Sequence, residues 1–141
     1  MMKPLQILAE KYVQMHQESA SSPEINANGD KFWYNDNREH HRLDGPAFIS
    51  SDGDKQWWVN GKPHRLDGPA VECANGGHKE WFVNGKRHRL DGPAIIYSDG
   101  SKEWYIDDKQ YTERGFNRYL KAVKARQDIL NKDNPGIEMD I

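Results

Sequence analysis

The sequence predicts a mainly β protein, an elongated antiparallel sheet of stacked β-hairpins with an α-helix at each end. Three observations support this fold class. The heptapeptide HRLDGPA occurs three times, letter for letter, at residues 41–47, 64–70 and 88–94. Asn-Gly and Asp-Gly pairs, which favour turns, recur between short apolar runs. The mean hydropathy is low, at -1.02, and the apolar content is concentrated in five Trp, six Tyr and four Phe, which suits thin β structure.

Composition and charge narrow the class of protein further. A chain of 141 residues is of a size typical of one domain with a modest core. The net charge of -2 comes from interspersed acidic and basic residues, so no global field favours nucleic acid or an anionic membrane. The single cysteine, Cys73, excludes an internal disulfide and a multi-cysteine metal cluster. Because no apolar run is long enough for a signal peptide or a membrane span, we expect a cytoplasmic protein.

The N-terminal segment, residues 1–20, is predicted to form a helix. Its apolar residues recur at helical spacing on one stripe, at Leu5, Leu8, Tyr12 and Met15. Residues 21–30 are expected to be a linker to the first hairpin. Terminal units of repeat proteins must protect unpaired strand edges, so this helix is a candidate cap.

Residues 31–111 are predicted to form the hairpin array, with a period of 23 to 24 residues. The Asn-Gly pairs at 60–61 and 84–85 indicate type I′ turns, in which both central residues need positive φ. Further turns are indicated at the opposite end of each unit, at Asp52-Gly53, Asn75-Gly76 and Asp99-Gly100. Since each unit is a hairpin, successive units are expected to pair into one elongated sheet.

Alternation of side chains along the strands assigns two faces to this sheet. One face carries the expected core ladder, which consists of Trp33, Trp57, Trp81 and Trp104. The other face carries a second aromatic row among polar neighbours, consisting of Tyr34, Trp58, Phe82 and Tyr105. Such a row is either covered by another element or exposed to bind a partner, and the sequence leaves both readings open.

A second helix is predicted over residues 112–134, followed by a tail at 135–141. Thr112 followed by Glu113 favours a helix start, and Pro135-Gly136 favours its end. The apolar stripe of this helix consists of Phe116, Leu120, Val123 and Leu130, flanked by Tyr119 and Ile129. The helix either caps the array or lies along the sheet and covers its aromatic row.

The Asp and His residues of the heptapeptide are interpreted as parts of a structural turn. They are Asp44, Asp67 and Asp91, with His41, His64 and His88. Each Asp precedes Gly-Pro, so we expect the carboxylate to accept backbone N–H bonds while the glycine takes positive φ. Equivalent histidines should lie about 10 Å apart, whereas zinc ligands lie about 2.1 Å from the ion, so they cannot share one metal. We therefore expect histidines bonded to neighbouring turns, and neither a metal nor a cofactor.

The arginines of the heptapeptide, Arg42, Arg65 and Arg89, have two interpretations. Each can pair with the Asp two residues further on, an exposed pair of the kind that contributes only about 0.5 kcal/mol. Alternatively, the regular row of guanidinium groups can bind carboxylates or phosphates on an extended partner. The first interpretation is favoured, but this row is also our candidate for partner contact. The other candidate contact residues are Trp58, Phe82 and Tyr105.

One stretch of the array resembles a known repeat family. Residues 84–88, Asn-Gly-Lys-Arg-His, are followed by a glycine and by the Asp99-Gly100 turn, and this pattern resembles the MORN repeat, a β-hairpin unit of similar length. The resemblance covers residues 31–111, although the Tyr-Gly pair that opens family repeats is missing and Arg-Leu-Asp separates the His from the Gly. The HRLDGPA wording is also similar to repeat proteins of bacteriophages and large viruses. The resemblance implies a hairpin array that binds proteins or acidic lipids, and it implies no catalysis.

Taken together, these patterns predict a non-enzymatic binding module. The sequence contains no phosphate loop, catalytic triad or paired-carboxylate pattern, and Cys73 suits a packing position because its counterparts are Ser50 and Tyr97. We expect a protein partner to dock on the sheet face and turn edge, and the viral resemblance implies an inhibitor or adaptor acting on a protein of the host cytoplasm. The alternative is a nucleic acid or a phosphorylated ligand along the Arg edge, bound with steep salt dependence. Exposed sheet ends also leave a homodimer open.

Overall fold

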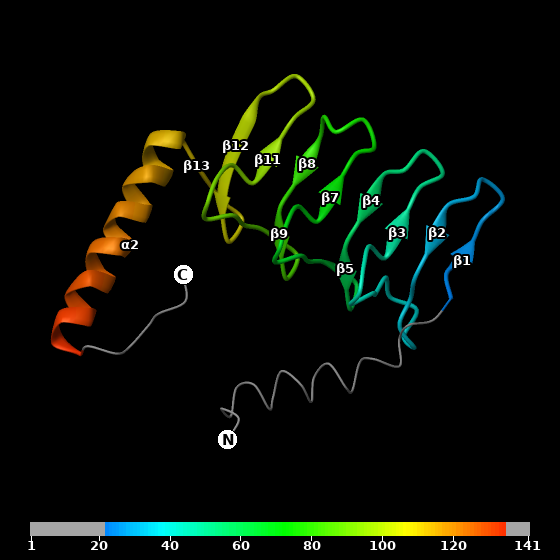
Figure 1. Cartoon of the computed structure of the whole chain (residues 1–141), viewed down its shortest axis with the longest axis horizontal. Helices are drawn as coiled ribbons and strands as arrows, with labels where there is room; N and C mark the ends of the chain where they lie inside the picture. The colour runs from blue at the N-terminus through cyan, green and yellow to red at the C-terminus, as the bar shows by residue number, and fades with distance from the viewer. Residues whose placement is uncertain (1–21, 135–141) are drawn as a thin grey trace.

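The computed structural model describes residues 22–134, which form a long antiparallel sheet of hairpins followed by one C-terminal helix. Figure 1 shows the hairpins side by side in a row, with the helix α2 (Glu113–Asp133) at one end. The main sheet has nine strands in the order β1-β2-β3-β4-β7-β8-β11-β12-β13. Its strands are β1 (Glu24–Ile25), β2 (Lys31–Phe32), β3 (Phe48–Ile49), β4 (Lys55–Gln56), β7 (Val71–Glu72), β8 (Lys79–Glu80), β11 (Ile95–Ile96), β12 (Lys102–Ile106) and β13 (Lys109–Tyr111). The predicted mainly β class and the antiparallel hairpin sheet are confirmed.

Two further strand pairs lie outside this main sheet. They are β5 (Trp58–Val59) with β6 (Lys62–Pro63), and β9 (Phe82–Val83) with β10 (Lys86–Arg87). The chain leaves the main sheet at Trp57, whose N–H donates to the Ala70 carbonyl at 2.8 Å and whose own carbonyl accepts the His64 N–H at 3.0 Å. Trp81 bends the chain in the same way before β9. The hairpins at Trp57 and Trp81 are therefore each divided in two, whereas β12 continues through Trp104 without a break.

The turns of the short strand pairs follow the sequence prediction. In the β5–β6 turn, φ is 48° at Asn60 and 75° at Gly61. In the β9–β10 turn, φ is 50° at Asn84 and 81° at Gly85. Both central residues thus occupy the left-handed region, as a type I′ turn requires, and the predicted hairpins are confirmed.

The first hairpin begins earlier than expected. β1 lies within residues 21–30, which the sequence analysis interpreted as a linker, and it pairs with β2. Gly29 has a φ of 86°, and the side-chain oxygen of Asn26 accepts the backbone N–H groups of Asn28 and Asp30 at 2.9 and 3.0 Å. An Asn-Gly turn therefore closes this hairpin, in the same way as the later Asp-Gly turns.

The core of the array includes three small residues at equivalent positions. The alanines that end the three heptapeptides are fully buried, with 0% of their surface exposed: Ala47, Ala70 and Ala94. Their carbonyls accept the backbone N–H groups of Trp33, Trp57 and Trp81, each at 2.8 Å. Because each alanine is completely enclosed by its neighbours, a larger side chain at the end of the heptapeptide would disturb the packing.

The helix α2, the one helix within residues 22–134, packs against the last two strands, at one end of the sheet. Its N-cap residue Thr112 accepts the Gly115 N–H at 3.0 Å, and Phe116 is buried with 3% exposure. Tyr111 and Tyr119 pack with their ring centroids 5.8 Å apart, and Figure 1 shows the helix leaning away from the row beyond this contact. The predicted helix is confirmed, and it does not lie along the aromatic row.

Other predictions for the chain ends lie outside the described residues. The helix predicted for residues 1–20 and the tail at 135–141 are among these. Within residues 22–134, no helix combines the length and apolar character needed to cross a bilayer.

Candidate binding surfaces

Each arginine of the heptapeptide lies over a tryptophan ring of the core ladder. The distances from guanidinium carbon to ring centroid are 4.0 Å for Arg42 over Trp33, 3.7 Å for Arg65 over Trp57 and 3.8 Å for Arg89 over Trp81. Such stacking of a planar cation on an indole face is attractive, more so where water is excluded. Only 20 to 22% of the three arginine side chains is exposed. The guanidinium groups therefore cover one face of each of these tryptophan rings.

Arg65 shows how the polar atoms of these side chains are used. Its Nε donates to Asp67 at 3.0 Å, and its Nη1 donates to the Pro69 carbonyl at 3.0 Å and to Glu72 at 3.0 Å. Arg42 and Arg89 make the equivalent bonds to their own Asp and Pro residues, at 2.9 to 3.1 Å. Partner contact by these arginines, whether with a protein or with an anionic ligand, stays a prediction. Such a partner would have to compete with contacts that the fold already makes.

The glycine of the heptapeptide was expected to take positive φ, and this prediction is wrong. Gly45, Gly68 and Gly92 lie outside the left-handed region. A Cβ atom at these positions would lie 2.9 to 3.0 Å from the guanidinium carbon of the preceding arginine. The glycine is therefore required for space, because the arginine folds back across it. The Asp carboxylates likewise bond the arginine Nε, whereas the sequence predicted backbone N–H partners.

The histidines of the heptapeptide connect successive hairpins. The Nδ1 atoms of His41, His64 and His88 accept the backbone N–H groups of Asn60, Asn84 and Asp107, at 2.9, 2.9 and 3.1 Å. Each histidine lies about twenty residues before the residue whose N–H it accepts. It therefore bonds the turn of the following hairpin, which is a type I′ turn for His41 and His64. Nδ1 must be unprotonated to accept, and burial lowers the pKa of His64 below its usual value.

A second set of bonds between hairpins lies at the opposite end of the strands. Asp30 accepts the Ser51 N–H at 2.7 Å, and Asp54 accepts the Ala74 N–H at 2.7 Å. In the next hairpin His78 takes the corresponding place and bonds Glu80 at 2.8 Å. The sequence analysis missed these aspartates, although each follows the glycine of a turn, a position from which a carboxylate can reach the adjacent turn.

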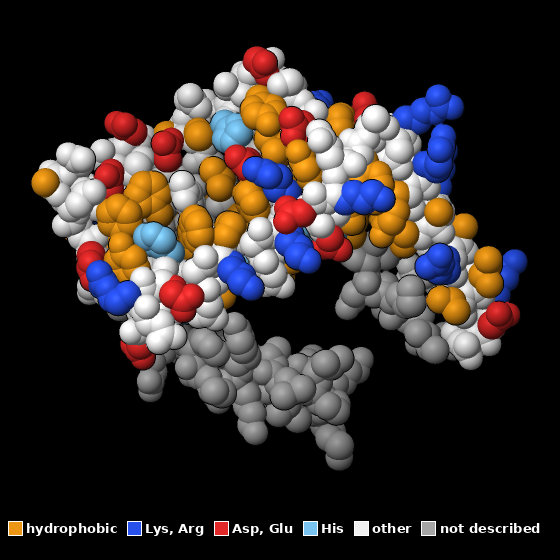
Figure 2. Space-filling view, turned by 180° about the vertical axis from the view of Figure 1, so that it is seen from behind, with side chains coloured by type: hydrophobic (Ala, Val, Ile, Leu, Met, Phe, Trp, Pro, Cys, Tyr) orange, Lys and Arg blue, Asp and Glu red, His pale blue; other side chains and the backbone are white. Residues whose placement is uncertain are grey.

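One face of the array, which we call the aromatic–polar face, carries rings interspersed with charged and amide groups. Its residues are Phe32, Tyr34, His40, Phe48, Gln56, Trp58, Glu80, Phe82, Arg87, Glu103 and Tyr105. Cross-strand pairing places Phe32, Phe48 and Gln56 in one row, and ring contacts join Phe32, Tyr34, His40 and Trp58 at centroid distances of 4.9 to 6.2 Å. Figure 2 shows hydrophobic side chains across this side of the array, with charged side chains and histidines between them.

Polar neighbours contact the three rings of this face that were predicted from the sequence to bind a partner. Trp58 donates its indole N–H to Gln56 at 3.0 Å, and the Tyr105 hydroxyl donates to Glu103 at 2.8 Å. The guanidinium carbon of Arg87 lies 5.6 Å from the ring centroids of both Phe82 and Tyr105. Trp58, Phe82 and Tyr105 are each half-buried, so part of each side chain remains accessible.

A second periodic surface follows the three HRLDGP corners, and we call it the corner edge. The leucine is exposed in the first two corners, with 41% exposure at Leu43 and 80% at Leu66, and Leu90 of the third corner is half-buried. The neighbouring Asp side chains are 68 to 86% exposed. Between successive corners lie two hollows of 540 and 560 Å³, floored by Trp57 and Trp81 respectively.

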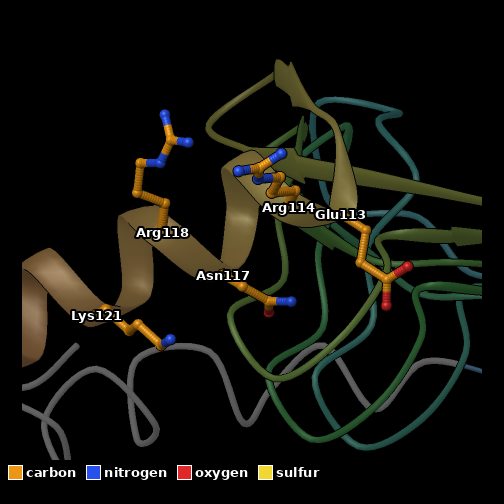
Figure 3. A pocket seen from close by; sticks show the side chains of 5 residues that line it. All are labelled: Glu113, Arg114, Asn117, Arg118 and Lys121. Carbon is orange, nitrogen blue, oxygen red and sulfur yellow. The ribbon is translucent and has the colours of Figure 1, made fainter.

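A further hollow, of 670 Å³, lies beside the first turns of α2. Its described lining consists of Glu113, Arg114, Asn117, Arg118 and Lys121, all from this one helix. Figure 3 shows that these side chains point in several directions from the helix surface. The groups do not converge on one point, as binding of a small ligand requires.

Metal-binding groups and the single cysteine were the remaining candidates for a reactive site. Within residues 22–134, no group of three or more His, Cys, Asp or Glu side chains is placed to hold a metal ion. Cys73 begins the turn between β7 and β8, and burial raises the pKa of its thiol. A raised pKa keeps the sulfur protonated, which is the less nucleophilic form.

Comparison of the chain with protein-family models, curated proteins and solved structures finds no match. The resemblance to MORN repeats therefore rests on the sequence motifs alone. The geometry of the two periodic surfaces is therefore the basis for proposing a function.

Proposed function

We propose that this chain is a non-enzymatic binding module that docks a protein partner on its aromatic–polar face. The observation that carries the proposal is that α2, the one helix within residues 22–134, packs on β12 and β13 at one end of this face. Its rings are large, held in place by polar neighbours and partly accessible, which is the character of residues that dominate protein interfaces. Ordered rings lose little side-chain entropy when a partner binds.

We also propose that the array is a divergent MORN-like repeat of 23 to 24 residues, capped at its N-terminal end by the predicted helix at 1–20. The support is the recurrence of one set of Arg, His and Ala contacts at all three heptapeptides. Terminal caps that shield strand edges are general in repeat proteins. A role as a viral or phage inhibitor or adaptor follows from the resemblance of the heptapeptide alone.

The docking proposal is tested by site-specific photocrosslinking in the organism of origin. A photoreactive phenylalanine analogue replaces Phe82 on the aromatic–polar face, and Tyr119 on α2 serves as the control position, because it is 38% exposed on another surface. We expect Phe82 to crosslink a defined protein and Tyr119 not to crosslink it. Equal crosslinking from both positions, or none from Phe82, contradicts the proposal.

The salt dependence of partner capture separates this function from the anionic-ligand alternative. Binding through aromatic contacts should change little between about 50 and 200 mM salt, whereas a phosphate-binding edge loses affinity steeply over this range. A Trp58→Ala variant should lose the captured protein at both salt concentrations. Retention of the partner by this variant, combined with loss at high salt, favours the alternative.

A further inference from the structure

Leucine is the one residue of the HRLDGP corner whose identity the fold does not explain. The histidine holds the next turn, the arginine lies on tryptophan, the Asp and the Pro carbonyl bind the arginine, and the glycine leaves room for it. Leu66, in contrast, is 80% exposed. A leucine that is exposed in two of the three corners, at Leu43 and Leu66, points to a contact outside the array.

The two hollows of the corner edge provide the surroundings for such a contact. Leu66 and Asp67 line both of them, since they stand on the ridge between the two. Each hollow is lined by a tryptophan, a valine, two leucines and two aspartates, and also by two arginines and a histidine of the corners. The corner edge therefore repeats one groove of mixed apolar and charged lining, in which the aspartates are more exposed than the arginines.

The spacing of the corners selects the shape of the occupant. Successive corners are separated by two strands of the main sheet, which corresponds to about 9.6 Å. A polyproline II helix rises about 3.1 Å per residue and has three residues per turn, so every third side chain recurs on one face after about 9.3 Å. A β-strand repeats its side chains after about 6.7 Å and does not match.

Charge selects the composition of the occupant. The Asp side chains of the corners are 68 to 86% exposed, whereas the arginines that pair with them are only 20 to 22% exposed. A ligand approaching from solvent therefore meets carboxylates before guanidinium groups. Lys or Arg residues on the ligand suit this rim, and acidic residues do not.

We propose that the corner edge binds an extended peptide segment in the polyproline II conformation, with an apolar residue at every third position and basic residues between. The apolar side chains enter the two grooves on either side of Leu66, and the basic side chains meet Asp44, Asp67 and Asp91. Aromatic-floored grooves bind this conformation well because the ligand is already ordered before binding. The inference extends the proposed docking function to a second surface, without using the aromatic–polar face.

The test measures binding of a fluorescent synthetic peptide, Leu-Pro-Lys repeated about four times, to the full chain. We expect a Kd of about 10 to 100 μM and a loss of at least about tenfold for the Leu66→Ser variant, because this leucine lines both grooves. Ile129→Ser on α2 is the matched control, since Ile129 is also an exposed aliphatic residue, at 62%. It should bind the peptide like the wild type.

Two altered peptides test the shape and the charge of the ligand. A peptide with Glu in place of Lys, and a peptide in which Leu and Lys strictly alternate, should each bind at least about tenfold more weakly. Equal binding of either peptide, equal binding by Leu66→Ser, or no binding by the wild type overturns the proposal. Concentration-dependent dimerisation that Leu66→Ser abolishes, without peptide binding, would show that a second copy of the chain occupies this edge. None of these outcomes alters the Phe82 crosslink, so failure here leaves the aromatic–polar face to its own test.

Discussion

At the scale of single residues, the heptapeptide acts as a corner in which the arginine is turned inward. Arg65 covers Trp57, bonds the Pro69 carbonyl and lies across Gly68. The sequence indicated the Arg–Asp pairing, because both residues recur in every copy. It did not indicate the stacking, because the bend at Trp57 that brings the ring under the arginine has no local signal.

The space requirement at Gly68 leads to a test by a double-mutant cycle. Gly68→Ala should destabilise the protein by about 1 to 2 kcal/mol, because the new Cβ displaces the Arg65 side chain from the Trp57 ring and from Pro69. In an Arg65→Ala background the same glycine substitution should cost much less, since nothing then occupies the space. The measurement is urea unfolding of the four proteins. Equal costs in both backgrounds would show that the glycine serves another purpose.

The half-buried His64 predicts a pH dependence of stability. Burial lowers the pKa of folded His64 below the value of 6.5 for a solvated imidazole. The unfolded chain therefore binds more protons as the pH falls, so this contribution is full above about pH 6.5 and is lost progressively below it. Urea unfolding between about pH 5 and 8 should show the loss on the acid side. His64→Gln, which keeps an acceptor but does not titrate, should flatten this slope, and an unchanged slope would contradict the assignment.

At the scale of elements, signals carried by neighbouring residues predicted the structure well. The turns at Asn60-Gly61 and Asn84-Gly85 and the helix α2 form where the sequence placed them. The hairpin at residues 24–32 was missed because Asn28-Gly29 has only two-residue strands on either side, which are too short to show alternation. The division of the hairpins at tryptophan was missed because bonds to distant residues impose it.

The start of α2 provides a prediction at this scale. Thr112→Ala removes the oxygen that accepts the Gly115 N–H and should reduce the free energy of unfolding by about 1 kcal/mol. Without this bond the first turn of α2 should fray, and far-UV circular dichroism should show reduced helicity. The contacts of α2 with β12 and β13 should weaken as a result. Thr112→Ser retains the hydroxyl and should resemble the wild type. Equal loss in both variants would mean that the cap contributes little.

At the scale of the whole molecule, two lines of hydrogen bonds hold the hairpins in a row. The histidines bind the following turn along one edge, and Asp30 and Asp54 bind the following turn along the other. Identical corners in sequence predicted that their side chains recur at regular spacing. The sequence could not show which side chains of the corner point inward. In the structure the arginines do, so the corner edge presents leucine and aspartate in place of the arginines expected from the sequence.

The central claim, that the three arginines belong to the fold, is tested most directly by thermal unfolding of a triple variant. Arg42, Arg65 and Arg89 are replaced together by Gln, and the control replaces three exposed arginines of α2, Arg114, Arg118 and Arg126. Loss of three stacked and bonded guanidinium groups should cost about 3 to 6 kcal/mol, a large part of the stability of a typical domain, and should lower the Tm by more than about 10 °C. The control should stay within about 3 °C of the wild type, because exposed charges contribute little. A triple corner variant that melts with the control would contradict the account and return these arginines to the candidate partner contacts.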